Sequence, residues 1–177
     1  MQRVGLSGKR ALVLGAETPV GKALAMALAE AGAAVAVVAA TTDAAAAFAV
    51  QRLARRIAAS GRRSLGQAIE ATNEMAVRVM TRQVSKALGG LDALLFCAEL
   101  GEGTAGAATL ACRFATREMA PDRGRGGTIV IVGEVPEGVE AAAREHSAQR
   151  VGVRGVTVSG EPDEGLVEEV LEILAGS

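Results

Sequence analysis

The chain has 177 residues, of which 50% are apolar and only 2% aromatic, and its formal net charge is −1. This length and apolar content predict a single folded domain over residues 1–177 and exclude a disordered chain. Nucleic-acid surfaces rely on basic patches or stacked aromatic side chains, so the composition argues against that class of function. No apolar leader precedes the first predicted strand, and the apolar stretch at 31–40 is too short to cross a bilayer. We therefore expect a cytoplasmic protein.

Apolar runs alternate along the chain with segments of helical periodicity. Six runs predict buried parallel strands, at residues 10–15, 34–40, 64–70, 91–97, 128–132 and 151–158. The periodic segments predict helices at residues 20–31, 43–60, 73–88, 104–119 and 163–174, with a short helix inside 133–150. Such alternation with short connections is typical of an α/β fold, a Rossmann-like doubly wound parallel sheet.

Apolar stripes and polar caps set further expectations for these helices. Thr42 or Asp43 should cap the second helix, because short polar side chains accept N–H groups at a helix start. The residues expected to face inward from the helix at 73–88 are Ala76, Val79, Met80, Val84 and Leu88. Those expected to face inward from the helix at 163–174 are Leu166, Val167, Val170, Leu171 and Leu174.

A glycine turn follows the first predicted strand. Residues 15–21 read Gly-Ala-Glu-Thr-Pro-Val-Gly, and a strand–turn–helix unit of this kind places backbone N–H groups where a pyrophosphate can bind. Gly15 allows the tight turn and Gly21 the close packing of the helix, so both are candidate cofactor contacts. Pro19 stands where a middle glycine would admit the phosphate, and Glu17 adds a negative charge. A turn that binds nothing is the favoured interpretation, and a dinucleotide turn is the alternative.

The end of the second predicted strand lacks a second expected contact. Dinucleotide folds place an acid there for the ribose hydroxyls, but Ala39 and Ala40 occupy the position. No arginine stands there for a 2′-phosphate either. Because this loss is independent of the changes in the glycine turn, the two together predict that the chain binds no cofactor tightly.

The two cysteines, Cys97 and Cys112, lie inside apolar segments. Cysteine in such a setting behaves as a small buried hydrophobic residue. Two cysteines without further ligands do not form a metal-site pattern. We expect both to be buried and reduced, and no metal site.

Five segments of the chain resemble the short-chain dehydrogenase/reductase family. They are the opening strand and turn at 6–16, the link at 29–35, the segment at 69–73, the approach to the fourth strand at 89–95 and the fifth strand at 125–132. The resemblance covers residues 6–133 and implies a Rossmann fold that, in the family, supports NAD-dependent oxidoreductase chemistry. The segment at 69–73 lies where the family has an acidic stretch touching adenine, which makes Glu70 a third candidate cofactor contact.

The departures from the family fall on the positions that carry its chemistry. The chain has no tyrosine, and the family's Tyr-x-x-x-Lys pair is matched only by His146 and Arg150. Gly133 and Glu134 stand where the catalytic serine should follow the fifth strand. In the family the tyrosine transfers the proton and the lysine lowers its pKa, so the resemblance with these losses implies no catalytic residue in this chain. The alternative is that His146 acts as the acid–base group.

The chain is also shorter than the family pattern. The family's substrate lobe and last strand have no counterpart, so we expect a sheet truncated at its C-terminal end, with an edge or face that a partner could cover. The helix at 104–119 corresponds to one that family members use to form oligomers. Its small residues would permit close helix packing; an interface with a partner is the favoured interpretation, and packing against its own sheet is the alternative. The small residues are Ala105, Gly106, Ala107, Ala108, Ala111 and Ala115.

A retained fold with lost chemistry indicates a catalytically silent subunit. We expect it to assemble with a homologous, intact short-chain dehydrogenase subunit that binds the NAD, as a hetero-oligomer and more specifically a heterotetramer. One such arrangement is the two-subunit 2-(hydroxyphenylmethyl)succinyl-CoA dehydrogenase of anaerobic toluene breakdown, whose degenerate subunit this chain resembles. Two alternatives stay open: a stand-alone nucleotide-binding sensor, and a divergent NAD(P)-dependent oxidoreductase that uses His146.

Overall fold

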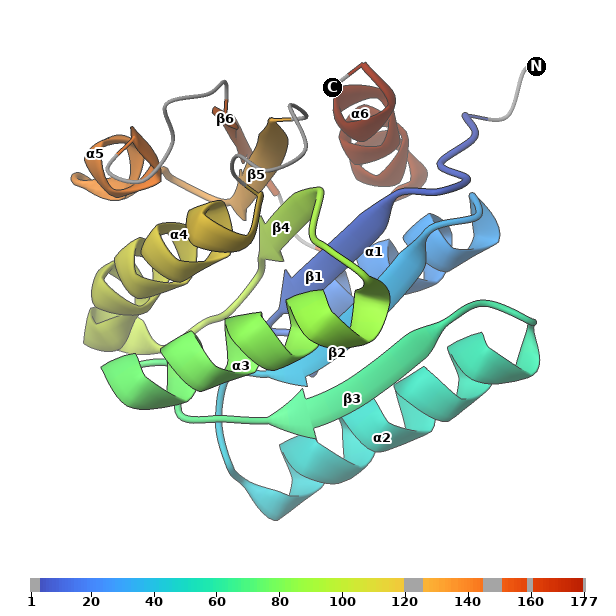
Figure 1. The fold of residues 1–177 in the computed structure, drawn as a ribbon, viewed down its shortest axis with the longest axis horizontal. Coiled ribbons are helices and arrows are strands. Elements are labelled where there is room, and N and C mark those ends of the chain that lie inside the picture. Colours follow the sequence, from blue (N-terminus) through green and yellow to red (C-terminus); the bar gives the residue numbers. More distant parts are fainter. Residues whose placement is uncertain (1–3, 120–125, 145–150, 159–160, 177) are drawn as a thin grey trace.

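The computed structural model describes residues 4–119, 126–144, 151–158 and 161–176, which form one central sheet flanked by helices (Figure 1). In this part of the chain six parallel strands pair in the order β3-β2-β1-β4-β5-β6. They are β1 (Arg10–Leu14), β2 (Ala34–Ala39), β3 (Ser64–Ala68), β4 (Ala93–Phe96), β5 (Gly127–Val132) and β6 (Val151–Val156). The strand order reverses between β1 and β4, which confirms the predicted doubly wound, Rossmann-like architecture.

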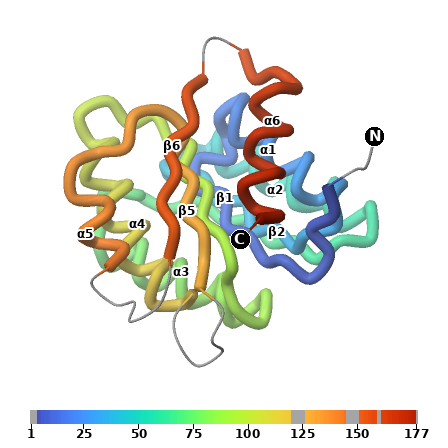
Figure 2. Tube along the Cα trace, turned by 90° about the horizontal axis from the view of Figure 1, so that it is seen from above, coloured from blue at the N-terminus to red at the C-terminus, as the bar shows by residue number. Residues whose placement is uncertain are grey.

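Helices cover both faces of the sheet (Figures 1 and 2). On one face lie α1 (Pro19–Glu30), α2 (Ala44–Ala59) and α6 (Glu164–Ala175). On the other lie α3 (Glu74–Leu88), α4 (Thr104–Met119), preceded by the short 3-10 helix η1 (Gly101–Gly103), and α5 (Val139–Arg144). Among the described residues, none of these helices combines the length and the apolar character that crossing a bilayer requires.

Each face of the sheet has its own hydrophobic core. Successive side chains of a strand point to opposite faces, so β1 contributes Leu12 and Leu14 to the core under α3, α4 and α5. Ala11 and Val13 of the same strand enter the core under α1, α2 and α6. A strand of this sheet needs apolar residues at successive positions, because both of its faces are covered by helices. The unbroken apolar runs in the sequence meet this need.

Polar side chains define several helix starts. Thr18, Asn73 and Asp163 cap α1, α3 and α6, and each accepts an N–H from the first turn of its helix. The prediction that Thr42 or Asp43 would cap α2 through a side-chain hydrogen bond is wrong. Asp43 occupies the cap position, with Thr42 before it, but the side chain of Asp43 accepts no capping hydrogen bond.

Helix α3 buries a different stripe from the expected one. Val79 is 45% exposed, so its predicted inward position is wrong, whereas Val77 is fully buried. Met80, Val84 and Leu88 are buried as predicted. Spacings of three, four and four residues place Val77 on the same side of the helix as these three, while Val79 projects from the opposite side.

Helix α6 faces its core with a narrower stripe than expected. Leu166, Val170 and Leu174 are buried. Val167 and Leu171 are only half-buried, so the predicted inward position of these two holds in part. The outer side of α6 therefore has an apolar margin.

An ion pair joins the starts of β1 and β4. The guanidinium of Arg10 donates to both carboxylate oxygens of Asp92, at 2.9 and 3.0 Å, and to the carbonyl of Gly89, while the Arg10 N–H also donates to Asp92 at 2.9 Å. Burial alone would raise the pKa of Asp92, but the hydrogen bonds and charge of Arg10 outweigh burial and hold this pKa below its ordinary value. The pair fixes the register of two neighbouring strands at one edge of the sheet.

We expect Asp92→Asn to lower the free energy of unfolding at pH 7 by about 1.5–3 kcal/mol, because charge-assisted hydrogen bonds to Arg10 are lost. A carboxyl with a lowered folded-state pKa stabilises the protein above its ordinary pKa and ceases to do so as the pH falls through the folded value. The deficit of the variant should therefore shrink in acid. Urea denaturation at pH 7 and at a pH below 3.8, the ordinary pKa of this carboxyl, measures the change.

The matched control is Glu140→Gln, which removes a carboxylate from an exposed pair with Arg144, whose side chains are 64% and 77% exposed. Exposed pairs contribute little, so the urea midpoint of this variant should stay close to that of the parent. Equal effects of the two substitutions would contradict a structural role for the Arg10–Asp92 pair.

Candidate functional site

The candidate site is the edge of the sheet where β1, β2 and β4 end. In an open parallel sheet, ligands bind at the carboxyl ends of the strands, at the switch point between strands such as β1 and β4. The glycine turn after β1 lies at this edge. The N–H groups of Gly15 and Ala16 donate to the carbonyl of Val38 at 2.8 and 3.1 Å, which holds the turn against β2.

Both candidate glycines of the turn are enclosed by the chain's own backbone. Gly15 has a φ of 95°, and a Cβ at this position would lie 2.4 Å from the backbone nitrogen of Ala98, which follows β4. A Cβ on Gly21 would lie 2.2 Å from the carbonyl oxygen of Gly15. The packing of the turn against α1 and the end of β4 therefore accounts for both glycines without a ligand.

The start of α1 is satisfied within the turn itself. Thr18 accepts the N–H of Gly21 at 3.0 Å and donates its hydroxyl to the carbonyl of Gly15 at 2.7 Å. Pro19, the first helical residue, has no N–H. Of the first three helical residues, only Val20 keeps an N–H that no described residue accepts. A helix start binds anions through free N–H groups, and this one offers few.

Glu17 reaches from the turn to the end of β2. Its two carboxylate oxygens accept the N–H of Ala40, at 3.3 and 3.2 Å from the nitrogen. Burial raises the pKa of Glu17, although the N–H groups of Glu17 itself and of Ala40 oppose the shift. A carboxylate therefore does stand at the end of β2, but it comes from the glycine turn and is directed at the chain's own backbone. The sequence indicated the charge of Glu17 and not this contact.

We expect Glu17→Gln to raise the melting temperature at pH 7.5, because the amide can still accept the N–H of Ala40 without a half-buried charge. The folded-state pKa of Glu17 is raised, so the folded protein binds the proton more tightly than the unfolded chain. Stability of the parent should therefore fall as the pH rises from about the ordinary carboxyl pKa through the raised one. Thermal melts across this pH range should show the melting temperatures of the parent and of Glu17→Gln converging at the acid end. A variant that is less stable than the parent at pH 7.5 would contradict this account.

Glu70, the third candidate cofactor contact, follows β3 and binds the loop after β2. One of its carboxylate oxygens accepts the hydroxyl of Thr42 at 3.1 Å and the N–H of Thr42 at 3.3 Å. The residue is exposed. Gly15, Gly21 and Glu17 are thus brought together at the turn, while Glu70 stands on a neighbouring loop. The carboxylates of Glu17 and Glu70 both bind residues that follow β2.

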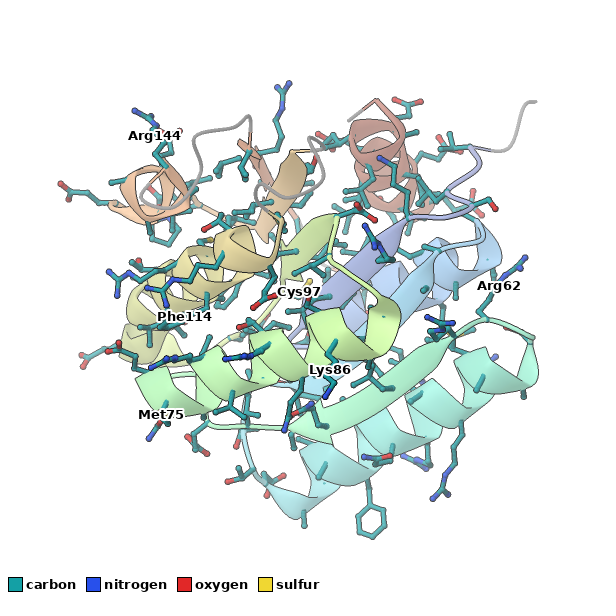
Figure 3. All side chains as sticks on the ribbon, in the orientation of Figure 1. Arg62, Met75, Lys86, Cys97, Phe114 and Arg144 are labelled. Atoms are coloured by element: carbon teal, nitrogen blue, oxygen red, sulfur yellow. The ribbon has the colours of Figure 1, made fainter. Side chains whose placement is uncertain are left out.

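Cys97, labelled in Figure 3, directly follows β4 and contacts Thr18 of the glycine turn. Burial, with a smaller contribution from the charge of Glu17, raises the pKa of its thiol to about 12. Its N–H donates to the carbonyl of Leu14 at 2.8 Å, and its carbonyl accepts the hydroxyl of Thr18 at 3.4 Å. Cys112 is also buried, and both cysteines are free, as predicted. A thiol protonated at neutral pH is a packing group rather than a nucleophile.

The positions that carry the chemistry of short-chain dehydrogenases have different residues here. Gly133 follows β5 with a φ of 108°, and its N–H donates to the carbonyl of Val156 at 2.7 Å. Glu134, the next residue, is exposed. Neither supplies the hydroxyl that the catalytic serine of the family supplies. His146 and Arg150 lie outside the described residues.

The described residues at this edge do not fit a nicotinamide dinucleotide. Phosphate binding needs N–H donors without a competing anion, but Pro19 removes one donor and Glu17 adds a carboxylate. Ribose recognition needs an acceptor or a cation on the end of β2, where Ala39 and Ala40 are buried and apolar. The two mismatches concern different parts of the ligand, so they add to each other.

The alanine-rich run of α4 packs mainly inside its own domain. Ala105 and Gly106 are exposed. The other four small residues are fully buried: Ala107, Ala108, Ala111 and Ala115. These four pack on the chain's own sheet, which was the alternative to the favoured interface with a partner. A groove of about 650 Å³ lies between α4 and α5, and its lining includes Thr109, Arg113, Ala141 and Arg144.

A second cavity, of about 1010 Å³, lies at the opposite edge of the sheet, where β1, β5 and β6 begin. Its charged lining residues are Lys9, Asp92, Arg154 and Glu172. Asp92 is already bound to Arg10. The cavity contains none of the residues that the sequence singled out, and its balanced charges favour no particular ligand.

Comparison with known proteins agrees with the fold. The chain is 34% identical to a short-chain type dehydrogenase/reductase from Mycobacterium marinum, with a TM-score of 0.65, and the match covers 74% of this chain and 57% of that one. It is 30% identical to a short chain dehydrogenase from Burkholderia cenocepacia J2315 in complex with NADP, with a TM-score of 0.61 and coverage of 78% and 63%. The chain therefore spans less than two thirds of the length of either protein.

A metagenomic short-chain oxidoreductase in complex with NADP has a TM-score of 0.75, at 22% identity and with coverage of 97% and 93%. Identity this low supports the fold alone. No curated protein matches the chain. The short chain dehydrogenase family matches residues 9–161, which is most of the chain. The protein is therefore a member of the short chain dehydrogenase family.

Proposed function

We propose that this chain is a catalytically silent member of its family that assembles with an intact, NAD-dependent short-chain dehydrogenase subunit. The observation that carries the proposal is the contact between Glu17 and the N–H of Ala40, at 3.3 and 3.2 Å. This contact places a carboxylate where the family binds its cofactor and occupies it with a hydrogen bond to the chain's own backbone. The absence of tyrosine from the sequence supports it, because the family's proton donor is then missing.

The partner proposed for this chain is homologous to it, and the complex is a hetero-oligomer, proposed as a heterotetramer in the cytoplasm. The exposed surface of α4 and α5 offers a place for contact, with Ala105 and Gly106 allowing close approach and the groove beside Thr109 admitting side chains. The role of this chain would be to stabilise or position the active subunit, and the partner would hold the NAD.

The reaction class proposed for the complex is oxidation of a hydroxyacyl-CoA-type alcohol. This rests on the analogy with the two-subunit 2-(hydroxyphenylmethyl)succinyl-CoA dehydrogenase of anaerobic toluene breakdown, in which a degenerate subunit accompanies an intact one. The analogy concerns the pairing of intact and degenerate subunits rather than any substrate contact of this chain.

Co-expression with an intact short-chain dehydrogenase encoded beside it tests the proposal. A tagged chain should retain that subunit through size exclusion, and hydride transfer should require the partner's tyrosine and not His146 of this chain. Hydride transfer by the isolated chain, lost in His146→Ala, would replace the proposal with the divergent oxidoreductase. Tight binding of NAD or NADP to the isolated chain in calorimetry would favour the nucleotide sensor.

A further inference from the structure

The outer side of α3 combines cations with exposed apolar side chains. Arg78, Arg82 and Lys86 are exposed and follow one another at intervals of four residues, so they form one stripe along the helix. Met75 and Val79, at 61% and 45% exposure, lie beside that stripe. Met75 and Lys86 are labelled on α3 in Figure 3. Both apolar side chains therefore lie beside the cations on a surface that the chain's own core does not cover.

The outer side of α6 has the opposite charge in the same spacing. Glu164, Glu168 and Glu172 are exposed and also follow at intervals of four residues. The half-buried Val167 and Leu171 form the apolar margin beside them. The helix contains no lysine or arginine, so carboxylates repel one another along its length and Glu172 faces the negative end of the helix dipole.

These two stripes are unpaired within the described residues. None of their six charged side chains forms an ion pair with another described residue. They also lie on opposite faces of the sheet, because α3 packs on one core and α6 on the other (Figures 1 and 2). The two helices of one molecule therefore have no way to satisfy each other.

We propose that α6 of one copy of this chain docks on α3 of a second copy. The charges of the two stripes are opposite in sign and equal in number and spacing. The exposed Met75 and Val79 of α3 would contact the apolar margin of α6 rather than water. Because the two surfaces differ and lie on opposite faces, the contact is head-to-tail and leaves a free α3 at one end and a free α6 at the other. Such contacts add further copies instead of closing into a dimer, unless a ring forms.

The surfaces used differ from the exposed part of α4 and the groove beside α5, so this inference is independent of the partner proposed above. Exposed ion pairs are individually weak and are screened when the Debye length becomes short. The association should therefore be weak, concentration-dependent and sensitive to salt.

Sedimentation velocity of the full chain tests the proposal. In about 0.02 M salt the weight-average sedimentation coefficient should rise with protein concentration without a dimer plateau, and in about 0.5 M salt the apparent association constant should fall at least about tenfold. A chain that stays monomeric at low salt over the whole concentration range would overturn the proposal. This arm needs no variant and so does not depend on variant folding.

Charge reversal identifies the surfaces. The triple variant Arg78→Glu, Arg82→Glu, Lys86→Glu and the triple variant Glu164→Lys, Glu168→Lys, Glu172→Lys should each be monomeric at low salt. Mixing the two should restore association, because both stripes of the first variant are then acidic and both stripes of the second are basic, so each contact between unlike variants joins opposite charges. Failure of the mixture to associate, with both variants folded by circular dichroism, would overturn the pairing of α3 with α6.

The matched control changes the same amount of charge elsewhere. Arg52→Glu, Arg55→Glu, Arg56→Glu reverses three exposed cations of α2 and should leave association within about twofold of the parent. If this control abolishes association as fully as reversal on α3, net charge rather than the α3 surface would be responsible. Vesicles of anionic lipid that bind the parent and not the α3 variant, without self-association, would assign the stripe to a membrane instead.

Discussion

Replacing Gly15 by alanine should destabilise the protein by at least about 2 kcal/mol, whether or not any nucleotide is present. A residue with a side chain at positive φ is strained by about 1–3 kcal/mol. Overpacking against the backbone of Ala98 adds about 1–3 kcal/mol more. Gly21→Ala should also destabilise the protein, but by crowding alone, because its φ is not positive and its Cβ meets the carbonyl oxygen of Gly15. Thermal unfolding with and without NAD measures both.

Gly8→Ala is the control for conformation without crowding. Gly8 has a φ of 83°, but a Cβ there meets nothing within 4 Å. Gly8→Ala should lower the free energy of unfolding by about 1–2 kcal/mol, from the strain of the backbone conformation alone. If Gly15→Ala and Gly21→Ala were no more harmful than Gly8→Ala, the glycines of the turn would need an explanation other than packing, and a bound ligand would be the first to consider.

The double variant Glu17→Ser, Pro19→Gly should bind NAD or NADP at least about tenfold more tightly than the parent. Removing the carboxylate relieves repulsion of phosphate, and glycine returns an N–H to the start of α1; a charge-assisted hydrogen bond alone is worth about 1.5–3 kcal/mol. Isothermal calorimetry on the isolated chain measures the change. Binding should stay weak in absolute terms, because Ala39 and Ala40 still offer nothing to the ribose.

The control for this variant is Glu30→Ser combined with Pro19→Gly. Glu30 is an exposed acid at the far end of α1, so its removal changes the net charge by the same amount at a distance from the turn. Equal affinities of the two double variants would mean that the carboxylate of Glu17 does not exclude the nucleotide. No gain in either would assign the loss of binding to the end of β2 instead.

The two losses at the cofactor edge have different structural consequences. At the end of β2 the contact to a ribose is simply missing, since the side chains of Ala39 and Ala40 are buried in the core and carry no polar group. Around the glycine turn, N–H groups that could bind a phosphate are already occupied, since Thr18 accepts the N–H of Gly21 and Glu17 accepts that of Ala40. The chain's own hydrogen bonds therefore hold the glycine turn and the end of β2 together, which supports the silent role proposed above.

Much of the architecture follows from the sequence alone. Buried parallel strands need apolar residues on both faces, and the runs that became β1, β2, β4 and β5 have them without interruption. Helical periodicity predicted starts at 73, 104 and 163, each within one residue of the observed starts of α3, α4 and α6. These are local properties of the chain, so neighbouring residues suffice to predict them.

Only the tertiary structure decided where the long and the small side chains go. Local spacing did not show that Glu17 would reach Ala40, because β2 is distant in sequence and approaches the turn only when the sheet has formed. Val79 faces solvent and the alanines of α4 face the core because the packing of each helix on its neighbours selects the buried side. The residue types of the site were therefore legible from the sequence, whereas their partners depend on contacts between segments far apart in the chain.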